Sequence, residues 1–317
     1  MSATEQQITI PPRLRETVAA LPQPDGSGAA WLAALPALAA AARERWQLTL
    51  ERVVEPGGRG SLVVQVLRAD GSPAVLKLGL PTPESAQEHA ALAHWDGRGA
   101  VRLLAAAPED RALLLERLHG EVPLRSLAEA RAMLEAEGTL QRLWVAPPEG
   151  HPFDSVGERV ALLAAAVRER RALPAAAGLG GTAGVGLGAL VDEALGTAAE
   201  LLASEPEQLL LHGDFHHGNV LAAERSPWLA IDPEPLVGER AYDLAWLAQD
   251  RLDTLAAAPG PQSVARRRLQ RLADAVEVDR ERLRGWTLFR SVEAGLRHLA
   301  VGDTEGAELY LEFAAML

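Results

Sequence analysis

The chain contains no cysteine, which excludes disulfide bonds, thiolate metal sites and catalysis by a thiol. It also lacks an excess of basic residues, because 31 Lys and Arg stand against 43 Asp and Glu, a formal net charge of −12 at pH 7. Proteins bind nucleic acids largely by neutralising phosphates, so a chain without a basic stripe is not expected to bind them in general. The missing cysteines fit a reducing compartment, and we expect a cytoplasmic protein.

Long apolar segments are missing as well. The longest uncharged stretch, residues 172–191, contains Pro174 and several glycines, so it predicts a flexible connection rather than a membrane-spanning helix. The first twenty residues are mixed and charged, unlike a signal peptide. What is present, 317 residues of which 48% are hydrophobic, predicts a helix-rich globular protein large enough for two lobes around a cleft, with no membrane partner.

The first part of the chain predicts a helix followed by an antiparallel sheet. Leucines and alanines recur at helical spacing over residues 29–46. Three β-rich runs follow, residues 48–54, 62–68 and 74–80, and Asp70-Gly71 between the last two is a strong hairpin signal. The first two runs are joined by a loop that contains Gly58, Gly60 and Ser61. Small residues there would let backbone amides approach a phosphate, although a plain hairpin turn explains them equally well.

The segment HGDFHHGN, residues 212–219, is the most informative part of the chain. Asp214 and Asn219 have the spacing HxDxxxxN, and Asp232 follows the apolar run WLAI. This order resembles the catalytic loop and metal-binding aspartate of kinase-fold enzymes. There, Asp214 would accept the proton of the attacking hydroxyl, while Asn219 and Asp232 would supply oxygen ligands to Mg²⁺. The three histidines do not complete a zinc set, and His212 is expected to tether the loop. A non-catalytic alternative, in which Asp214 and Asn219 only shape a turn, stays open.

Residues that could bind a nucleotide precede this loop. Lys77 lies within an apolar strand, where it could hold the α and β phosphates of ATP or simply extend to water from an edge strand. Residues 84–92 predict a helix with Glu84 and Glu88 one turn apart, and Glu88 is the preferred partner of Lys77. The strand ALLLERL, residues 112–118, would then present the backbone of Glu116 and Leu118 to the adenine edge.

With these residues in order, the chain resembles the aminoglycoside phosphotransferase family over roughly residues 48–250. The stretches HWDGRGAVRLL, LLLERL and AIDPEPLVGERAYDLA are most similar to the streptomycin 6-phosphotransferase and hydroxyurea-kinase branch. The resemblance implies that Lys77 and Glu88 form an ion pair, and that ATP and Mg²⁺ are the cofactors. It also implies that Asp243 braces the catalytic loop, and Asp243 is further expected to cap a helix. One departure is Glu234-Pro235, where that branch typically has Lys-Gly.

The acceptor is expected to bind in the second half of the chain. Besides Asp214, the carboxylates of Glu239 and Asp250 could bind cationic groups of an acceptor, with ordinary surface charge or capping as the alternative. Helices are predicted over residues 126–143, 155–172, 263–283 and 286–299. Trp286, Phe289 and Tyr310 are expected to pack in the core, and Arg266 to Arg268 to face solvent.

Together these observations predict an α+β, protein-kinase-like, two-lobed fold. The expected nucleotide-binding lobe comprises residues 1–118, including the leading helices and the hinge, and the helical catalytic lobe comprises residues 119–317. The expected activity is ATP- and Mg²⁺-dependent transfer of a phosphoryl group to a hydroxyl of a small molecule, an aminoglycoside of the streptomycin type. The alternatives are a metabolic small-molecule kinase with another acceptor and a nucleotide-binding regulatory module without turnover, since one fold hosts many functions.

Overall fold

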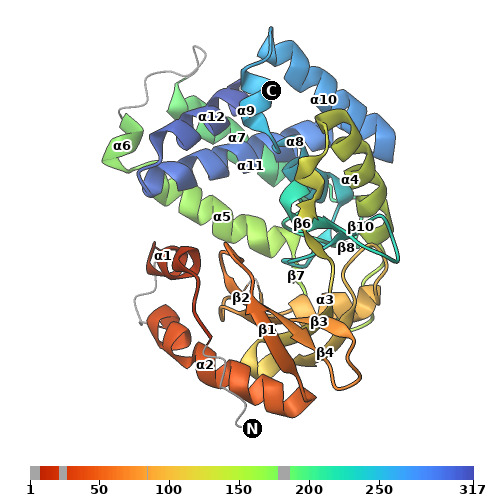
Figure 1. The fold of residues 1–317 in the computed structure, drawn as a ribbon. Helices are drawn as coiled ribbons and strands as arrows, with labels where there is room; N and C mark the ends of the chain where they lie inside the picture. The colour runs from red at the N-terminus through yellow and green to blue at the C-terminus, as the bar shows by residue number, and fades with distance from the viewer. Residues whose placement is uncertain (1–7, 21–26, 84, 178–185) are drawn as a thin grey trace. The chain divides into compact units, whose positions relative to one another are not determined.

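The structure is a computed structural model that describes residues 8–20, 27–83, 85–177 and 186–317 (Figure 1). The chain divides into two compact units. Unit 1 comprises Met1–Glu121 and Ala223–Leu229, and unit 2 comprises Val122–Ala222 and Ala230–Leu317. A short segment from the second half of the chain thus belongs to unit 1.

Unit 1 is built around a five-stranded sheet of order β1-β2-β3-β5-β4, in which all neighbouring strands run antiparallel. The predicted hairpin is confirmed, because Gly71 has a φ of 79° and the Arg68 N–H donates to the Ser72 carbonyl. The elements of this unit are α1 (Pro12–Ala20), α2 (Ser27–Trp46), β1 (Thr49–Val53), β2 (Ser61–Leu67), β3 (Pro73–Gly79), α3 (Glu88–Trp95), β4 (Leu103–Ala107), the short 3-10 helix η1 (Pro108–Asp110) and β5 (Ala112–Glu116).

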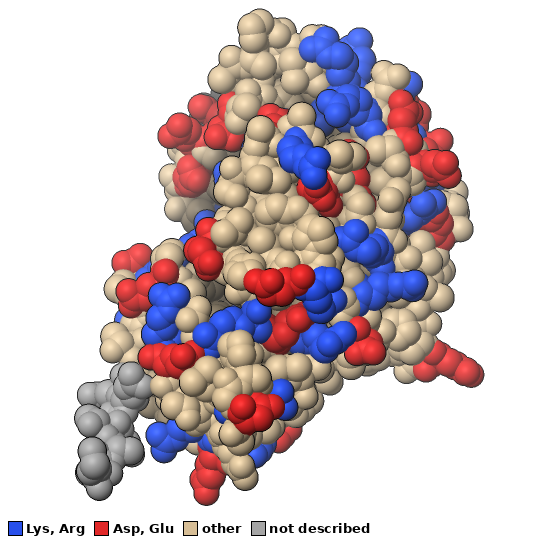
Figure 2. All heavy atoms as spheres, turned by 45° about the vertical axis from the view of Figure 1, so that its right-hand side comes forward, with Lys and Arg blue, Asp and Glu red and all other residues tan. Residues whose placement is uncertain are grey.

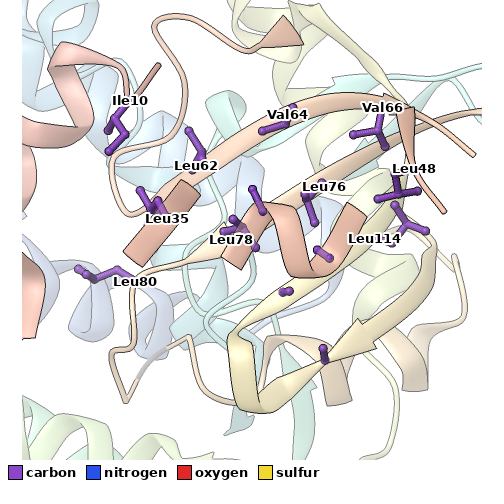
Figure 3. Close-up of a cluster of buried hydrophobic side chains, with 14 of the residues drawn as sticks. Ile10, Leu35, Leu48, Leu62, Val64, Val66, Leu76, Leu78, Leu80 and Leu114 are labelled. Carbon is purple, nitrogen blue, oxygen red and sulfur yellow. The ribbon is translucent and has the colours of Figure 1, made fainter. Parts of the chain in front are cut away.

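The core of unit 1 lies between α2 and one face of the sheet. Leu35 of α2 packs with Leu62 and Val64 of β2 and with Leu76 and Leu78 of β3 (Figure 3). All five side chains are almost completely inaccessible to solvent. Burial of a leucine side chain stabilises a fold by about 1.5–3 kcal/mol, so this cluster fixes the register of the strands.

This register decides where Lys77 lies. Successive residues of a strand point to opposite faces, so Lys77 lies on the face opposite to its neighbours Leu76 and Leu78, which join the α2 core. Lys77 pairs with Val63 on β2 and with Leu113 on β5. β3 is therefore a central strand of the sheet, and the edge-strand explanation of this lysine is wrong.

The chain passes between the units within β6 (His119–Pro123), directly after β9 (Val220–Ala222) and within β10 (Trp228–Ala230). These three strands form a sheet of order β10-β9-β6. Unit 2 is mainly helical. Its remaining elements are η2 (Leu124–Ser126), α4 (Glu129–Leu143), β7 (Asp154–Ser155), α5 (Val156–Arg170), α6 (Pro174–Ala177), α7 (Leu187–Ala203), β8 (Leu209–Leu211), η3 (His217–Asn219), β11 (Leu236–Gly238), α8 (Arg240–Ala248), α9 (Leu252–Ala256), α10 (Pro261–Val276), α11 (Arg280–Ala300) and α12 (Thr304–Ala315).

Helix α11 is the centre of unit 2, where it packs against α5, α7, α8 and α12. Trp286 and Phe289 on this helix are fully buried, which confirms the prediction that they are core residues. A small sheet of order β7-β11-β8 lies beside the helices, with Leu236 of β11 opposite Leu211 of β8 in an antiparallel pair. This pair aligns the chain just after residue 232 with the chain just before residue 212.

Several predicted boundaries need correction. The helix expected over residues 84–92 begins at Glu88, and Glu84 lies outside the described residues. The single helix expected over 263–283 is broken, because Glu277 adopts a φ of 54° and ends α10. The flexible connection expected over 172–191 is shorter than predicted, because α7 begins at Leu187. The apolar stripe of α7 packs against α11. Residues 178–185 lie outside the described part of the chain.

Charged side chains follow the predicted pattern only in part. Acidic and basic groups are interspersed over the face shown in Figure 2. Arg266 and Arg267 are exposed as expected, but Arg268 is only 8% exposed and binds the carbonyl of Asp250 and the carboxylate of Glu129. Its prediction as a solvated residue was therefore wrong. None of the helices in the described ranges is long and apolar enough to cross a membrane.

Candidate active site

The loop that follows β8 is held by its backbone. The Asp243 carboxylate accepts hydrogen bonds from the backbone N–H groups of His212 and Gly213, both at 2.9 Å, and from Trp144 Nε1 at 3.0 Å. Asp243 has no exposed surface, and it lies inside α8, whose N-cap is Glu239. The expected brace of the loop is therefore present, while the expected capping role was wrong.

Gly213 is required by the close approach of two chain segments. It has a φ of 79°, and a Cβ added there would lie 1.9 Å from the Glu234 carbonyl oxygen. The Glu234 N–H in turn donates to the His212 carbonyl at 2.9 Å. No side chain fits in this space, so the segment after Asp232 packs directly on the start of the loop that carries Asp214.

Asp214 and Asn219 are in direct contact. The Asn219 side-chain amide donates to Oδ2 of Asp214 at 3.1 Å and to its backbone carbonyl at 3.0 Å. With Nδ2 used in this way, Oδ1 is the atom of the Asn219 amide that can act as an oxygen ligand. Burial raises the pKa of Asp214 to about 6, although the positive charge of Arg290 opposes that rise and the negative charge of Asp232 adds to it.

Asp232 is attached to the same loop through the backbone. The N–H of Ile231 donates to the Asn219 carbonyl at 2.9 Å, and His212 Nε2 lies 3.0 Å from the Ile231 carbonyl. His212 thus tethers the loop, as expected. Asp232 has a φ of 55°, a conformation that costs free energy for a residue other than glycine, although aspartate tolerates it better than most residues.

The two adjacent histidines point in different directions. His216 Nδ1 accepts from the Gly218 N–H, and its Nε2 lies 3.9 Å from Asp214 Oδ2. Burial lowers the pKa of His216. His217 Nδ1 lies 2.6 Å from Asp250 Oδ2, and its backbone N–H donates to the same carboxylate. Within the described part of the chain no three His, Cys, Asp or Glu residues form a group that could hold a metal.

The carboxylates expected to bind an acceptor have internal partners. Glu239 is 1% exposed and accepts hydrogen bonds from Arg282 Nε at 2.5 Å and Trp286 Nε1 at 2.7 Å, which contradicts its prediction as an acceptor-binding residue. Asp250 holds His217 in place. Burial alone would raise the pKa of Asp250, but the hydrogen bonds and charge of His217 outweigh it and hold the pKa below its ordinary value. Asp250 therefore supports the loop, and nothing in its contacts directs it to an acceptor.

In unit 1 the expected ion pair is present. Lys77 Nζ lies 2.6 Å from Oε1 and 2.7 Å from Oε2 of Glu88, the first residue of α3. Lys77 is 7% exposed and Glu88 is 5% exposed. A buried ion pair is costly to break, because either partner alone would be an uncompensated charge in the interior.

The other residues expected at the nucleotide differ in their exposure to solvent and in their backbone hydrogen bonds. Gly60 is exposed in the loop between β1 and β2, Gly58 is half-buried, and Ser61 is 5% exposed at the start of β2. At the end of β5 the Glu116 N–H donates to the Arg102 carbonyl, and the Leu118 carbonyl accepts from the Gly120 N–H. The hinge role of Glu116 and Leu118 stays a prediction.

Two arginines, Arg225 of unit 1 and Arg290 of unit 2, were missed from the sequence. Arg225 binds the Glu116 carboxylate, and Arg290 on α11 stacks over the ring of Trp246 at 4.0 Å with Nη1 3.3 Å from the Tyr242 hydroxyl. The sequence could have indicated Arg290, because a charged residue at this position interrupts the apolar face of the amphipathic helix α11. No local pattern indicates Arg225.

Comparison with known proteins places the chain in a family. Residues 45–302 match the family described as aminoglycoside/hydroxyurea antibiotic resistance kinase. A streptomycin 6-kinase from Streptomyces glaucescens is 40% identical over 87% of this chain and 87% of its own length. A hydroxyurea phosphotransferase from Kitasatospora aureofaciens is 41% identical over 92% of this chain and 81% of its own length.

Solved structures support the same fold. An aminoglycoside phosphotransferase in complex with ADP and hygromycin B has a TM-score of 0.59 at 15% identity, covering 87% of this chain and 96% of that one. An ethanolamine kinase from Plasmodium vivax has a TM-score of 0.55 at 12% identity, covering 85% of this chain and 81% of that one. The kinase-like α+β fold and the family resemblance are thereby confirmed, and the chain belongs to the aminoglycoside/hydroxyurea antibiotic resistance kinase family of phosphotransferases.

Proposed function

We propose that this protein transfers the γ-phosphoryl group of ATP to a hydroxyl group of an aminoglycoside of the streptomycin type, with Mg²⁺ as cofactor, in the cytoplasm. The contact between Asp214 and Asn219, in a loop braced by Asp243, carries the proposal. It offers a base and a metal-binding amide oxygen side by side. The streptomycin 6-kinases among the relatives support the choice of acceptor.

Asp214 is the proposed general base. A pKa of about 6 leaves the carboxylate ionised at neutral pH, and it also makes the group more basic than an ordinary aspartate. The acceptor hydroxyl would place its proton on a carboxylate oxygen of Asp214 as its own oxygen attacks the γ-phosphorus. The bond from that phosphorus to the β–γ bridging oxygen would break at the same time, and ADP would leave with the bridging oxygen. The Asn219 amide, bonded to Oδ2, holds the carboxylate in one orientation during this transfer.

Asn219 and Asp232 are the proposed ligands of Mg²⁺. Both offer the hard oxygen atoms that Mg²⁺ prefers, and two protein ligands suffice because this ion keeps waters and binds substrate phosphates. When bound, Mg²⁺ would neutralise negative charge on the phosphate oxygens. The hydrogen bond from the Ile231 N–H to the Asn219 carbonyl joins the backbone segments that carry the two proposed ligands.

Lys77 and Glu88 are the proposed nucleotide-binding pair, with the lysine on the α and β phosphates and the glutamate orienting it. The backbone at Gly58, Gly60 and Ser61 would cover the phosphates, and the backbone of Glu116 and Leu118 would face the adenine. Of these contacts, the ion pair has the strongest support, because it is buried and its geometry is fully formed.

Hydroxyurea is the second candidate acceptor, favoured by the hydroxyurea phosphotransferase at 41% identity. The decisive experiment measures ADP release by the purified protein with streptomycin, hydroxyurea, hygromycin B and ethanolamine, and locates the added phosphate by mass spectrometry. We expect turnover with streptomycin and less than about one hundredth of it for Asp214→Asn.

Several outcomes of this experiment discriminate between functions. Turnover only with ethanolamine or another metabolite would favour a metabolic kinase. Nucleotide binding without transfer to any acceptor would favour a regulatory module. Near wild-type turnover by Asp214→Asn would refute the assignment of the base.

A further inference from the structure

Residues 223–229 form the tip of the hairpin between β9 and β10, and this tip belongs to unit 1. Its Arg225 binds the carboxylate of Glu116 at the end of β5. Nε lies 3.0 Å from Oε1 and 2.9 Å from Oε2, and Nη2 lies 2.5 Å from Oε1. The remaining donors reach backbone carbonyls, with Nη1 2.6 Å from Gly97 and Nη2 2.7 Å from Ala100.

The partners of Arg225 leave space for its guanidinium and hold the acceptor atoms in place. Gly97 has a φ of 79°, and a Cβ there would lie 3.0 Å from Arg225 Nη2, so a glycine leaves room for the guanidinium. Glu116 also accepts the Arg102 N–H at 2.7 Å, which holds its carboxylate in place. The side chains of Arg225 and Glu116 are 28% and 20% exposed. A planar guanidinium whose three nitrogens are each directed at fixed acceptors defines a position more sharply than a surface ion pair does.

The hairpin that Arg225 anchors is also the connection between the two candidate metal ligands. Asn219 immediately precedes β9, and Asp232 lies two residues after β10. The bond from the Ile231 N–H to the Asn219 carbonyl closes the base of this hairpin. Any change in the position or register of the hairpin therefore moves both ligands together.

The other end of the contact belongs to nucleotide-binding elements. Glu116 ends β5, from which the hinge continues, and Gly97 and Ala100 lie in the loop that leaves α3, the helix that begins with Glu88. We propose that Arg225 is a positioning residue that holds the tip of the metal-ligand hairpin on the hinge strand and on the loop after α3, and that its loss weakens the binding of nucleotide with Mg²⁺. This inference rests on the proposed function of Asn219, Asp232 and the hinge.

Arg225 is expected to contribute more to the position of the hairpin than to the stability of the fold. A partly exposed ion pair contributes only about 0–1 kcal/mol to folding, so removing the guanidinium should leave the fold intact. Displacement of a catalytic group by about 1 Å can nevertheless slow a reaction by about a hundredfold. Loss of Arg225 should thus affect metal and nucleotide use well before it affects folding.

The test compares Arg225→Met, Arg225→Lys, Glu116→Gln and the double variant Arg225→Met/Glu116→Gln with the wild type. Arg45→Met is the matched control, because Arg45 also bridges carboxylates in unit 1, but its partners Glu109 and Asp110 belong to η1 and not to the hairpin. The readouts are KM for ATP, KM for the acceptor, the Mg²⁺ concentration for half-maximal rate, calorimetric affinity for Mg²⁺ with AMP-PNP, and hydrogen exchange of the Ile231 amide.

We expect Arg225→Met to raise KM for ATP and the Mg²⁺ requirement about tenfold, and to leave the acceptor KM within about twofold. AMP-PNP affinity should fall to the same extent, and the Ile231 amide should exchange faster. Arg225→Lys should restore only part of the loss, because an ammonium cannot bind a carboxylate through two parallel bonds. The double variant should be no worse than Arg225→Met, since both changes remove one interaction.

Unchanged ATP and Mg²⁺ dependence in Arg225→Met, or a loss that adds fully to that of Glu116→Gln, would overturn this positioning role. If Arg225→Met does not fold, Arg225→Lys and Glu116→Gln provide the same comparison. If the wild type transfers phosphate to no acceptor, the proposed function fails. The AMP-PNP affinities and the exchange of the Ile231 amide still decide the role of Arg225, independently of turnover.

Discussion

Replacement of Asp214 by asparagine should stabilise the nucleotide-free protein while abolishing transfer. Asparagine has nearly the same shape as a protonated aspartate but never ionises. In the folded protein the pKa of Asp214 is raised from 3.8 to about 6 by burial, so the ionised carboxylate is disfavoured there relative to the unfolded chain. Wild-type protein bears this cost at neutral pH, and the variant does not.

The magnitude follows from the pKa difference. A rise from 3.8 to about 6 corresponds to about 3 kcal/mol of unfolding free energy lost above pH 6. This value is a ceiling, because the side chain keeps 27% exposure and solvent screens part of the effect. Since the pKa of Asp214 is higher in the folded protein, the loss of unfolding free energy is absent below pH 3.8. It grows as the pH rises and is complete above about pH 6.

The assay is urea unfolding with EDTA at pH 5, 6, 7 and 8, followed by tryptophan fluorescence. We expect the variant to be more stable by at least about 1 kcal/mol at pH 8, with a smaller gain at pH 5. Asp274→Asn removes an exposed carboxylate of α10 and is the control, with an expected difference within about 0.5 kcal/mol. A variant gain that is absent, or that increases toward low pH, would refute the reasoning.

Three further predictions concern other parts of the protein. Lys77→Met should raise KM for ATP and destabilise the fold by about 3–5 kcal/mol, because Glu88 loses the buried positive charge that faces it. Lys77→Met/Glu88→Gln should recover much of the stability but not the KM, measured by urea unfolding and kinetics. Asp243→Ala should cost about 3 kcal/mol or more, since three buried donors lose their acceptor, and it should lower kcat more than either KM value. Glu239→Gln should lower the melting temperature by weakening the contact with Arg282 and leave the acceptor KM within about twofold; a selective rise of that KM would restore Glu239 as an acceptor-binding residue.

Much of unit 1 was predictable from local sequence. The alternation of apolar residues in the runs around Leu62 and Leu76 indicated strands, and Asp70-Gly71 indicated the turn that joins them, because both signals depend on neighbouring residues only. The break after α10 was not predictable in the same way. Glu277 adopts a left-handed conformation that its residue type does not favour, and the amphipathic pattern continues across it.

At the candidate site, spacing in the sequence identified Asp214, Asn219 and Asp232, and the loop geometry brings the first two into contact. The prediction for Glu239 failed for a physical reason. A carboxylate near a metal-binding loop has the same sequence signature whether it faces a ligand or the core, and only the packing of Arg282 and Trp286 against it decides which. Arg268 failed in the same way through its contact with Glu129.

The sequence by itself determined the family, the motif proposed to supply base and metal ligands, and several of the strands and helices, because these depend on residues close together in the chain. Apart from Lys77 and Glu88, only the tertiary structure decided which charges are paired. The partners Glu239 and Arg282 are 43 residues apart, Glu116 and Arg225 are 109 apart, and Glu129 and Arg268 are 139 apart. Contacts at such separations arise from packing of the whole chain, and no local pattern of residue types encodes them.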